Sequence, residues 1–296
     1  IAHNESGDIV KRILVTGSNG FIGSHLVTEL KKHYTVFCHD RTNGDLCTHK
    51  DFPQVDVVFH LAANVSTHEF YTKSFEVMKN NVTATINICE FYQQQEQKPL
   101  FIYAGTAEAQ AGATEHFDYK IPTDEACPFV ITDPKNLRWS YASSKAIGEQ
   151  IVIASGLPYI IFRPYNVYGP KQTGHFVPEF IQRALKNKFE LHGHANTRSW
   201  LHVDDCVQAL MLLLENSAHT TGEIFNIGHP EEIAVIDVAK CILKHMKKDV
   251  DMGLYRAPVG SVSRRAPDIT KIKNAVGWTP TIDLDEGIKN TVEAMT

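Results

Sequence analysis

The chain has 296 residues, with 29 lysines and arginines against 34 aspartates and glutamates, so its formal net charge is −5. No block of basic residues interrupts this balance, so neither a nucleic acid nor a membrane surface is expected as a partner. A hydrophobic content of 43% is enough for a sizeable core and predicts a globular protein of one large or two modest domains.

The cysteines and histidines predict neither disulfides nor a metal site. The six cysteines lack the paired spacing of a metal site, and we interpret them as free thiols of a reducing cytoplasm. The 15 histidines form no pair with convincing ligand spacing, so no metal is predicted. No apolar stretch approaches a membrane span, and residues 1–11 lack the apolar region of a signal peptide, so we expect a cytoplasmic protein.

The first chemical motif is the glycine-rich segment TGSNGFIG at residues 16–23. It follows an apolar strand pattern at residues 12–16 and opens an amphipathic helix. In a dinucleotide-binding turn, Gly17 permits the tight turn, Gly20 lets the backbone approach a pyrophosphate, and Gly23 lets the helix pack on its strand. The helix N-terminus would face the phosphates with unpaired N–H groups. The alternative is a turn with a purely structural role.

A second strand pattern, at residues 35–39, ends at Asp40, where dinucleotide-binding folds place an acidic residue beside the adenosine ribose. A carboxylate there accepts hydrogen bonds from ribose hydroxyls and repels a 2′-phosphate, so Asp40 favours NAD over NADP. The adjacent Arg41 partly offsets that repulsion. The alternative is that Asp40 only begins a turn.

Strand and helix patterns alternate through the first half of the chain. Buried strands are expected at residues 57–61 and 100–104, with a helix at residues 73–94 between them. This alternation predicts an α/β fold, a Rossmann-type doubly wound parallel sheet. Only a short polar stretch, residues 42–54, joins the second strand to the third, so the usual crossover helix there must be short or absent.

The pattern changes after a fifth strand at residues 159–163, where prolines and glycines interrupt it and smaller elements follow. We therefore predict two domains. Residues 12–165 would form the NAD-binding Rossmann domain. Residues 166–296 would form mainly a smaller C-terminal α/β substrate-binding region, with some segments returning to the first domain.

Tyr141 and Lys145, in the segment YASSK, form the second chemical motif. A spacing of four residues places both side chains on one face of a helix. A cation beside a phenol favours the ionised phenol, which makes Tyr141 a candidate general base. An ordinary helix with a surface Tyr and Lys is the alternative interpretation.

Several motifs, in order along the chain, resemble those of the extended short-chain dehydrogenases/reductases that modify nucleotide sugars, the NAD-dependent epimerase/dehydratase family. The motifs are the glycine turn, Leu61-Ala62-Ala63, Tyr141 with Lys145, and residues 163–170 (RPYNVYGP), 197–205 (TRSWLHVDD), 265–269 (RAPDI) and 277–280 (GWTP). The resemblance covers essentially the chain from Arg12 onward. It implies a homodimer formed through paired long helices, including the helix of Tyr141.

By this resemblance a defined group of residues lines the NAD cofactor. The group is Gly17, Gly20, Phe21, Ile22, Asp40, Arg41, Asp45, Leu46, Leu61, Ala62, Ala63, Asn81, Tyr141 and Lys145. Asp45 and Leu46 resemble the family's adenine-contacting pair. Lys145 would bind the nicotinamide ribose while favouring the ionised form of Tyr141, and Asn81 matches a supporting asparagine. A local turn at Asn81 and simple close packing at Ala62 are the structural alternatives.

The resemblance also implies a nucleotide-diphosphate sugar as substrate. Asn166, Arg198 and Arg265 match the family's diphosphate ligands, and cations and amides are the groups that hold a pyrophosphate. For either arginine alone, a solvated surface position is the alternative. Thr106 matches the Ser or Thr that, with Tyr141, hydrogen-bonds the sugar hydroxyl being oxidised. The sequence does not identify the nucleotide or the sugar.

The catalytic group implied by the resemblance is Thr106, Glu108, Tyr141 and Lys145. Tyr141 would take the hydroxyl proton while hydride passes to the cofactor, giving a 4-keto sugar. The family's 4,6-dehydratases carry Thr-Asp-Glu after the fourth strand, its decarboxylases commonly Thr-Ser-Glu, and many of its 4-epimerases no acid. This chain has Ala107 between Thr106 and Glu108, so it supplies a carboxylate for C5 proton chemistry but lacks the expected dehydratase acid.

We therefore predict an NAD-dependent nucleotide-sugar epimerase/dehydratase, an isomerase or lyase, in which hydride returns to the sugar. Decarboxylation of a UDP-hexuronate is the alternative, because Arg138-Trp139, just before Tyr141, resembles a pair in UDP-glucuronate decarboxylases. Gln110 departs from the Tyr that is usual in the family. A third alternative, a non-catalytic dinucleotide-binding sensor or partner-binding protein, is disfavoured because such proteins typically lose the Tyr or the Lys.

Overall fold

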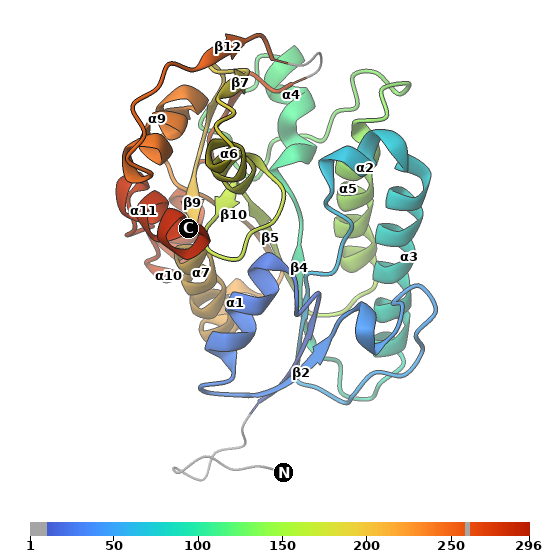
Figure 1. The fold of residues 1–296 in the computed structure, drawn as a ribbon. Coiled ribbons are helices and arrows are strands. Elements are labelled where there is room, and N and C mark those ends of the chain that lie inside the picture. Colours follow the sequence, from blue (N-terminus) through green and yellow to red (C-terminus); the bar gives the residue numbers. More distant parts are fainter. Residues whose placement is uncertain (1–10, 258–260) are drawn as a thin grey trace. The chain divides into compact units, whose positions relative to one another are not determined.

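The computed structural model describes residues 11–257 and 261–296, which belong to two compact units (Figure 1). The first unit comprises residues up to Ala109, Asp133–Arg163 and Leu210–Phe225. The second comprises Gln110–Thr132, Pro164–Ala209 and Asn226–Thr296. Each unit therefore combines segments that are far apart in the sequence. Apart from Lys11, the N-terminal segment considered for a signal peptide lies outside the described residues.

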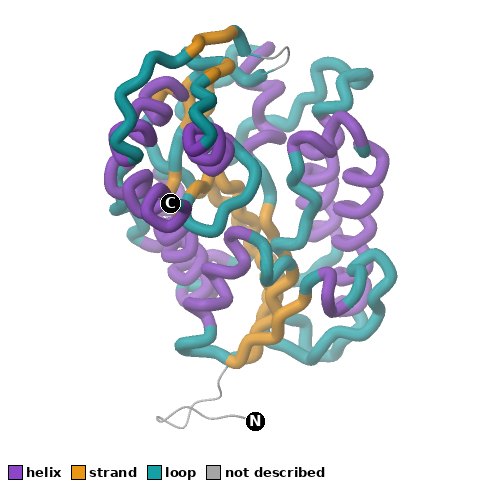
Figure 2. The backbone as a smooth tube through the Cα atoms, viewed as in Figure 1, coloured by secondary structure: helices purple, strands orange, loops and turns teal. Residues whose placement is uncertain are grey.

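A six-stranded sheet, with its strands in orange in Figure 2, forms the centre of the first unit in the order β10-β5-β4-β3-β1-β2. The strands are β1 (Arg12–Thr16), β2 (Thr35–His39), β3 (Val57–His60), β4 (Leu100–Ala104), β5 (Tyr159–Pro164) and β10 (Glu223–Ile227). Strands β1 to β5 pair in parallel. The strand order reverses between β1 and β3, which is the place where doubly wound sheets bind ligands.

Helices lie on both faces of this sheet (Figure 1). The helices are α1 (Phe21–Leu30), α2 (Thr67–Thr72), α3 (Ser74–Gln93), α5 (Trp139–Ala154) and α8 (Ser217–Thr220). α3 and α5 pack side by side on one face, and α1 lies on the other. Because both faces are covered, β3 is buried along its whole length, and its first three residues, residues 57–59, are apolar. Val58, Ile88 and Phe101 belong to the resulting core.

The connection from β2 to β3 contains a single short 3-10 helix, η1 (Arg41–Asn43), and no α-helix, as the sequence predicts. Leu46, Phe52 and Val55, from the same connection, pack against the apolar core. β2 consequently remains a largely exposed edge strand.

The second unit is built from shorter elements. Its helices are α4 (Ala111–His116), α6 (Phe176–Leu185), α9 (Val235–His245), α10 (Thr270–Val276) and α11 (Leu284–Met295), and α7 (Val203–Glu215) begins in it. Its strands are β6 (Val167–Tyr168), β7 (Glu190–His192), β8 (Thr197–Arg198), β9 (Leu201–His202), β11 (Ile233–Ala234), β12 (Gly253–Tyr255) and β13 (Arg264–Arg265). α6, α9 and α11 pack together around an apolar cluster of their own that contains Phe180, Ile242 and Ile288.

Two sequence motifs meet in the second unit and serve its packing. The Asp205 carboxylate, in α7, accepts hydrogen bonds from the Thr281 N–H at 3.1 Å and from the Ile282 N–H at 2.9 Å. The Trp278 indole N–H donates to the Asp205 carbonyl oxygen at 3.1 Å. Residues 197–205 are therefore joined to residues 278–282 by hydrogen bonds, of which the one from Trp278 is buried.

Within the described residues, the helices are all too short or too polar to traverse a lipid bilayer.

Candidate active site

The glycine turn after β1 is closely packed. Gly17 has a φ of +69°, and a Cβ there would lie 2.8 Å from the backbone nitrogen of Ala62, which follows β3. A Cβ on Gly23 would lie 2.1 Å from the Gly17 carbonyl oxygen. A side chain at either position would displace backbone atoms, so this turn requires both glycines.

The N-terminus of α1 presents backbone N–H groups that its N-cap residue, Gly20, leaves without a side-chain cap. Phe21 and Ile22 begin the helix, and its first turn holds no acidic side chain. The first N–H groups of a helix have no intrahelical partners, and they lie at the positive end of the helix dipole. The geometry therefore fits a phosphate-bearing ligand.

Asp40, directly after β2, lies beside the glycine turn. Its carboxylate accepts hydrogen bonds from the backbone N–H of Asn19 at 2.9 Å and of Arg41 at 2.8 Å. Asp40 therefore begins the η1 turn and also contacts the glycine-rich segment. Further along the same connection, the Asp45 carboxylate accepts from the Cys47 N–H at 2.9 Å.

A chain of buried polar side chains begins at Thr16, the last residue of β1. The Thr16 hydroxyl lies 2.7 Å from His60 Nδ1, in β3, and His60 Nε2 lies 3.2 Å from the hydroxyl of Thr85, in α3. Complete burial, together with the charge of Lys145, lowers the pKa of His60 to about 3. The His60 ring is therefore neutral at neutral pH. Sequence reasoning missed His60 and Thr85, because neither belongs to a recognisable motif.

Asn81, in α3, continues this chain to α5. The Thr85 hydroxyl donates to the Asn81 carbonyl oxygen at 2.8 Å, and the Asn81 side-chain amide donates to the Ser144 hydroxyl at 3.0 Å. The Asn81 side-chain oxygen accepts from the Asn64 N–H at 2.7 Å. Ser144 donates in turn to the Tyr141 carbonyl oxygen at 2.7 Å. Asn81 therefore connects the segment after β3 to the second turn of α5.

Tyr141 lies in the first turn of α5, with its ring stacked on Phe70 of α2. The ring centroids are 4.6 Å apart and the ring planes differ by 8°. The hydroxyl of the neighbouring Ser140 donates to the Phe70 carbonyl oxygen at 3.2 Å. These contacts hold the ring in place while the Tyr141 side chain remains partly exposed.

Lys145, one helical turn further along α5, is 2% exposed. Its Nζ lies 4.2 Å from the centroid of the Tyr103 ring, in β4, which is a cation–π contact. Gly148 makes room for Tyr103, because a Cβ there would lie 1.9 Å from the phenol oxygen. Burial lowers the pKa of Lys145 to about 7, and the Glu149 carboxylate opposes this shift.

Glu149 forms a buried ion pair with Arg163 of β5. Arg163 Nε and Nη2 donate to the two Glu149 oxygens at 3.0 and 2.8 Å. A Cβ on Gly105 would lie 2.3 Å from Glu149 Oε1, so the glycine after β4 leaves room for this carboxylate. Sequence reasoning missed the pair, although the spacing of four residues from Lys145 placed Glu149 on the same face of the helix.

Of the two candidates after β4, Glu108 contacts Arg138, the residue before α5. The Thr106 hydroxyl accepts a hydrogen bond from the Glu108 N–H at 3.2 Å. Arg138 donates from Nε and Nη2 to Glu108 Oε1 at 3.1 and 2.5 Å, and both side chains are largely buried. Trp139 is also buried. The negative charge of Glu108 is therefore compensated by the Arg138 guanidinium, which belongs to the same unit.

Gln110, where the family usually has Tyr, is a buried part of the second unit. Its side-chain oxygen accepts from the Tyr165 hydroxyl at 2.5 Å, and its amide donates to the Asp124 carbonyl oxygen at 2.8 Å. The substitution is therefore accommodated by hydrogen bonds to neighbours in its own unit.

Arg198 and Arg265 lie opposite each other in the second unit. Strands β8 and β13 are parallel, and their register pairs the Cα atoms of these two residues. The Arg198 guanidinium donates to the carbonyl oxygens of Thr197 at 2.7 Å and of Ser263 at 3.2 Å. Two neighbouring cations repel each other, so their pairing across adjacent strands favours a bound anion.

Asn166, between β5 and β6, has a φ of +36°, which is uncommon for a residue with a side chain. Its carbonyl oxygen accepts from the Leu201 N–H at 3.3 Å. Its side-chain oxygen is buried and has no hydrogen-bond partner within the described part of the chain. Such an atom is an acceptor for a ligand or an ordered water.

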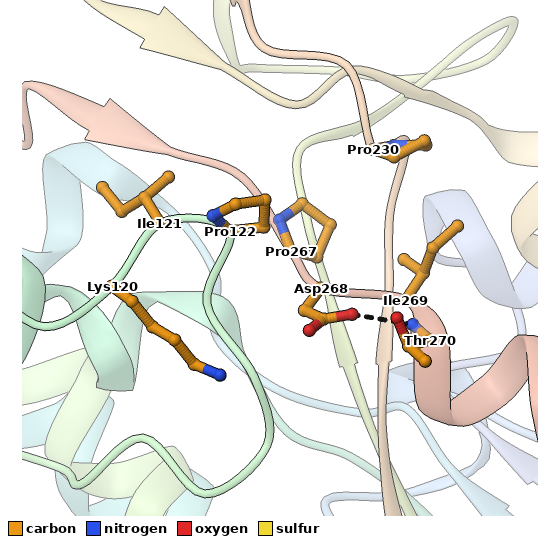
Figure 3. A pocket seen from close by; sticks show the side chains of 8 residues that line it. All are labelled: Lys120, Ile121, Pro122, Pro230, Pro267, Asp268, Ile269 and Thr270. Atoms are coloured by element: carbon orange, nitrogen blue, oxygen red, sulfur yellow. Dashed lines mark hydrogen bonds between the residues drawn. The ribbon is translucent and has the colours of Figure 1, made fainter.

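A hollow of about 380 Å³ lies elsewhere in the second unit (Figure 3). It is lined by Lys120, Ile121, Pro122, Pro230, Pro267, Asp268, Ile269 and Thr270. Its walls are mainly proline and aliphatic side chains, and the Asp268 carboxylate accepts from the Thr270 N–H at 2.9 Å. None of the predicted site residues lines this hollow, so it gives no support to the predicted chemistry.

Comparison with known proteins identifies relatives along nearly the whole chain. A model of the NAD dependent epimerase/dehydratase family matches residues 13–228. UDP-N-acetyl-alpha-D-glucosaminuronate decarboxylase of Bacillus cytotoxicus is 30% identical over 321 residues, covering 96% of this chain and 97% of that protein. The dTDP-D-glucose 4,6-dehydratase of Mus musculus is 30% identical over 331 residues, covering 97% and 89%.

A solved structure of similar fold is UDP-glucose 4-epimerase from Thermotoga maritima, determined with UDP-glucose. Its TM-score is 0.83 at 27% identity, and the match covers 96% of this chain and 98% of that one. Together these findings confirm the predicted family, the Rossmann-type α/β fold and NAD as the cofactor. They also agree with the predicted function and its decarboxylase alternative, leaving the subclass open. The protein is an enzyme of the NAD dependent epimerase/dehydratase family.

Proposed function

We propose that the enzyme oxidises C4 of a nucleotide-diphosphate sugar, with Tyr141 as the general base. The observation that carries this proposal is the buried Lys145 ammonium, one turn from the phenol and held over the Tyr103 ring. A cation in that place favours the ionised phenol. Thr106 hydrogen-bonds the sugar hydroxyl, and Tyr141 accepts its proton. When bound, NAD supplies the acceptor for the hydride that leaves C4.

The proposed cofactor site consists of the glycine turn, the N-terminus of α1, the segments after β2 and β3, and the first turns of α5. Its residues are Gly17, Gly20, Phe21, Ile22, Asp40, Arg41, Asp45, Leu46, Leu61, Ala62, Ala63, Asn81, Tyr141 and Lys145. The uncapped N–H groups after Gly20 and the close backbone approach at Gly17 support a pyrophosphate there. The Asp40 carboxylate supports NAD over NADP, because it would repel a 2′-phosphate.

We propose that Arg198, Arg265 and Asn166 bind the diphosphate and the nucleoside end of the substrate. The support is the pairing of the two arginines across β8 and β13 and the buried acceptor of Asn166. Arginine binds phosphate oxygens with paired, charge-assisted hydrogen bonds. The UDP and dTDP sugars in the names of the relatives support the same substrate class.

The fate of the 4-keto sugar defines the subclass. We infer that hydride returns to the sugar, so that NAD is regenerated in each turnover. Ala107 supplies no acid for a departing C6 hydroxyl, which favours epimerisation, an isomerase reaction, over dehydration, a lyase reaction. Glu108 would remove the C5 proton in dehydration, whereas epimerisation at C4 leaves the C5–H bond intact.

Decarboxylation of a hexuronate is the second candidate, and the Glu108–Arg138 ion pair favours it. A 4-keto group stabilises the electron pair left at C5 when carbon dioxide departs. An unpaired Glu108 would repel the substrate carboxylate, whereas the Arg138 guanidinium compensates the Glu108 charge. The relative from Bacillus cytotoxicus is a decarboxylase of a UDP-linked glucosaminuronate.

Mass spectrometry of the products would separate these reactions. The NAD-loaded enzyme would be incubated in deuterated water with UDP-, dTDP-, GDP- and CDP-sugars, including hexuronates. Unchanged composition with a chromatographically new sugar indicates an epimerase. Loss of water with solvent deuterium at C5 indicates a dehydratase, and loss of carbon dioxide indicates the decarboxylase. Turnover that survives unchanged in Tyr141→Phe would contradict the proposed base.

We also infer a homodimer formed through α3 and α5. These adjacent helices expose large apolar side chains, namely Phe75, Ile86, Ile147 and Ile153. Large apolar side chains left exposed on paired helices are typical of an interface. Light scattering should give the mass of two chains, and Ile147→Glu should give one. Leu185→Glu, at an exposed site on α6, is the matched control. A wild-type mass of one chain contradicts the inference.

We propose a cytoplasmic location because of the state of the cysteines. All six are free thiols, which suits a reducing compartment. Fractionation of the source cells would test this, and recovery of the enzyme from an oxidising compartment would contradict it.

A further inference from the structure

We propose that Cys241, His245 and Asp285 form a binding site for a divalent ion of the zinc class. The three side chains come from α9 and α11 in the second unit, and each offers one ligand atom. All three atoms lie within 4.8 Å of one another. The site is independent of the proposed NAD chemistry, because none of these residues belongs to it.

Helix geometry places the two residues of α9 together. Cys241 and His245 are four residues apart, so their side chains lie one turn apart on the same face. Asp285 lies in the first turn of α11, which packs against α9 through the apolar cluster that contains Ile242 and Ile288. This packing brings a carboxylate to a Cys–His pair that has no metal-binding signature in the sequence alone.

Two of the three ligand–ligand distances are close to the edges of a zinc tetrahedron. Zinc bonds of about 2.3 Å to sulfur and about 2.0–2.2 Å to nitrogen and oxygen give tetrahedral edges of about 3.4 Å for N···O and about 3.6 Å for S···O. In the structure His245 Nε2 lies 3.0 Å from Asp285 Oδ1, and Cys241 Sγ lies 3.6 Å from the same oxygen. These two distances are within a few tenths of an ångström of the tetrahedral edges, and the third, between the Cys241 sulfur and the His245 ring nitrogen, is at most 4.8 Å, against about 3.6 Å in a zinc site.

The ligand chemistry selects the class of ion. One thiolate, one imidazole and one carboxylate suit zinc, whereas magnesium and calcium prefer oxygen ligands throughout. The thiol proton of Cys241 is released to solvent as the sulfur–metal bond forms. The Asp285 side chain is 55% exposed, so a water molecule can complete the fourth position.

Lys244 competes with the ion for the carboxylate. Its Nζ lies 2.7 Å from Asp285 Oδ1, the oxygen that faces Cys241 and His245. The Lys244 side chain is 67% exposed and can swing into solvent. Exposed ion pairs of this kind contribute little to stability. The metal replaces this weak pair with bonds that connect α9 to α11.

Metal titration of the full-length, NAD-loaded protein tests the site. The protein would be stripped of metal, kept reduced with a phosphine, and titrated with Zn²⁺ by calorimetry and with Co²⁺ by absorption. We expect one ion per chain, a raised thermal midpoint and a thiolate-to-cobalt charge-transfer band. Cys241→Ser and His245→Ala should weaken binding by more than about 100-fold, since even outer-shell partners of a metal ligand contribute about 10–100-fold.

Three further variants sharpen this test. Lys244→Gln should tighten binding, because it removes the competing cation, and Asp285→Asn should weaken it at an exposed position that tolerates the change. Cys38→Ser, an exposed cysteine on β2, is the matched control and should bind as the wild type. Stoichiometric binding that survives Cys241→Ser and Asp285→Asn overturns the proposal. Absence of binding in both the wild type and Lys244→Gln overturns it as well.

Discussion

The helices α5 and α9 bury opposite kinds of side chain. The buried residues of α9 are all apolar: Val235, Val238, Ala239, Ile242 and Leu243. The buried residues of α5 include two serines, a lysine and a glutamate: Ser140, Ser144, Lys145 and Glu149. One helix therefore packs like an ordinary core element, and the other presents polar groups to the interior.

The comparison shows that α9 buries side chains that stabilise the fold, whereas α5 buries side chains that serve the proposed chemistry. Burying the Ile242 side chain removes apolar surface from water and stabilises the fold. Burying Lys145 and Glu149 strips hydration from charges, which costs free energy that the Tyr103 ring and the Arg163 guanidinium only partly offset. Perturbed ionisable groups of this kind gather where an enzyme needs them.

The largest expected effect is on turnover and comes from α5. Tyr141→Phe should lower kcat/KM by about 10²–10⁴-fold, because it removes the proposed base while the ring still stacks on Phe70. NAD binding and the thermal midpoint should stay close to the wild type. The exposed Tyr71→Phe serves as the control. A parallel loss of NAD binding would mean that Tyr141 acts mainly in structure.

Breaking the buried ion pair of α5 should be the most destabilising change. Glu149→Gln leaves the Arg163 guanidinium buried without its counter-charge, which should cost about 3–5 kcal/mol in the free energy of unfolding. The matched control, Glu29→Gln, breaks an exposed pair with Lys32 and should cost about 0–1 kcal/mol. Urea unfolding measures both. Equal losses of unfolding free energy in the two variants would show that burial of the ion pair does not determine its contribution to stability.

The corresponding change in α9 acts through a cavity. Ile242→Ala removes a fully buried side chain and should cost about 2–5 kcal/mol. Leu185→Ala, at an exposed position of α6 outside the proposed dimer interface, should cost much less. Calorimetric unfolding checks both variants. A loss at Ile242 no greater than that at Leu185 would contradict the apolar role assigned to α9.

The last two expected effects are pH dependences of stability, the first of them from the buried Lys145. Its folded pKa of about 7 lies below the ordinary 10.5, so between these values the unfolded chain binds the extra proton. The free energy of unfolding of the NAD-free protein should therefore rise with pH over this window, by up to about 1.4 kcal/mol per pH unit from this group. Lys145→Met should lose that rise. An identical pH slope in the wild type and in Lys145→Met would contradict the lowered pKa of Lys145.

His60 gives a second check, of the same sign, in acid. Its pKa of about 3 in the folded chain lies below the ordinary 6.5, so the unfolded chain takes up the proton first as the pH falls. This contribution to stability is present above pH 6.5 and is lost between there and about pH 3. His60→Asn should flatten that part of the wild-type curve, whereas the exposed His68→Asn should not.

Local patterns in the sequence were sufficient for the elements that carry the site. The glycine turn at Gly17, the short link between β2 and β3, and the parallel strands all follow from residue types and spacing over a few positions. Tyr141 and Lys145 share a helix face because four residues make about one turn. The family itself followed from several such motifs in order.

Tertiary structure decided which distant residues meet. His60 reaches Thr16 and Thr85, Glu149 reaches Arg163, and Cys241 reaches Asp285 only because strands and helices from separate parts of the chain pack together. Likewise residues 210–225 belong to the first unit and 110–132 to the second. Periodicity reports which face of an element is apolar, but the partner of that face depends on how the whole chain packs. The sequence alone therefore determined the motifs and the fold class, whereas the charges around Lys145 and the cluster at Cys241 were decided by long-range packing.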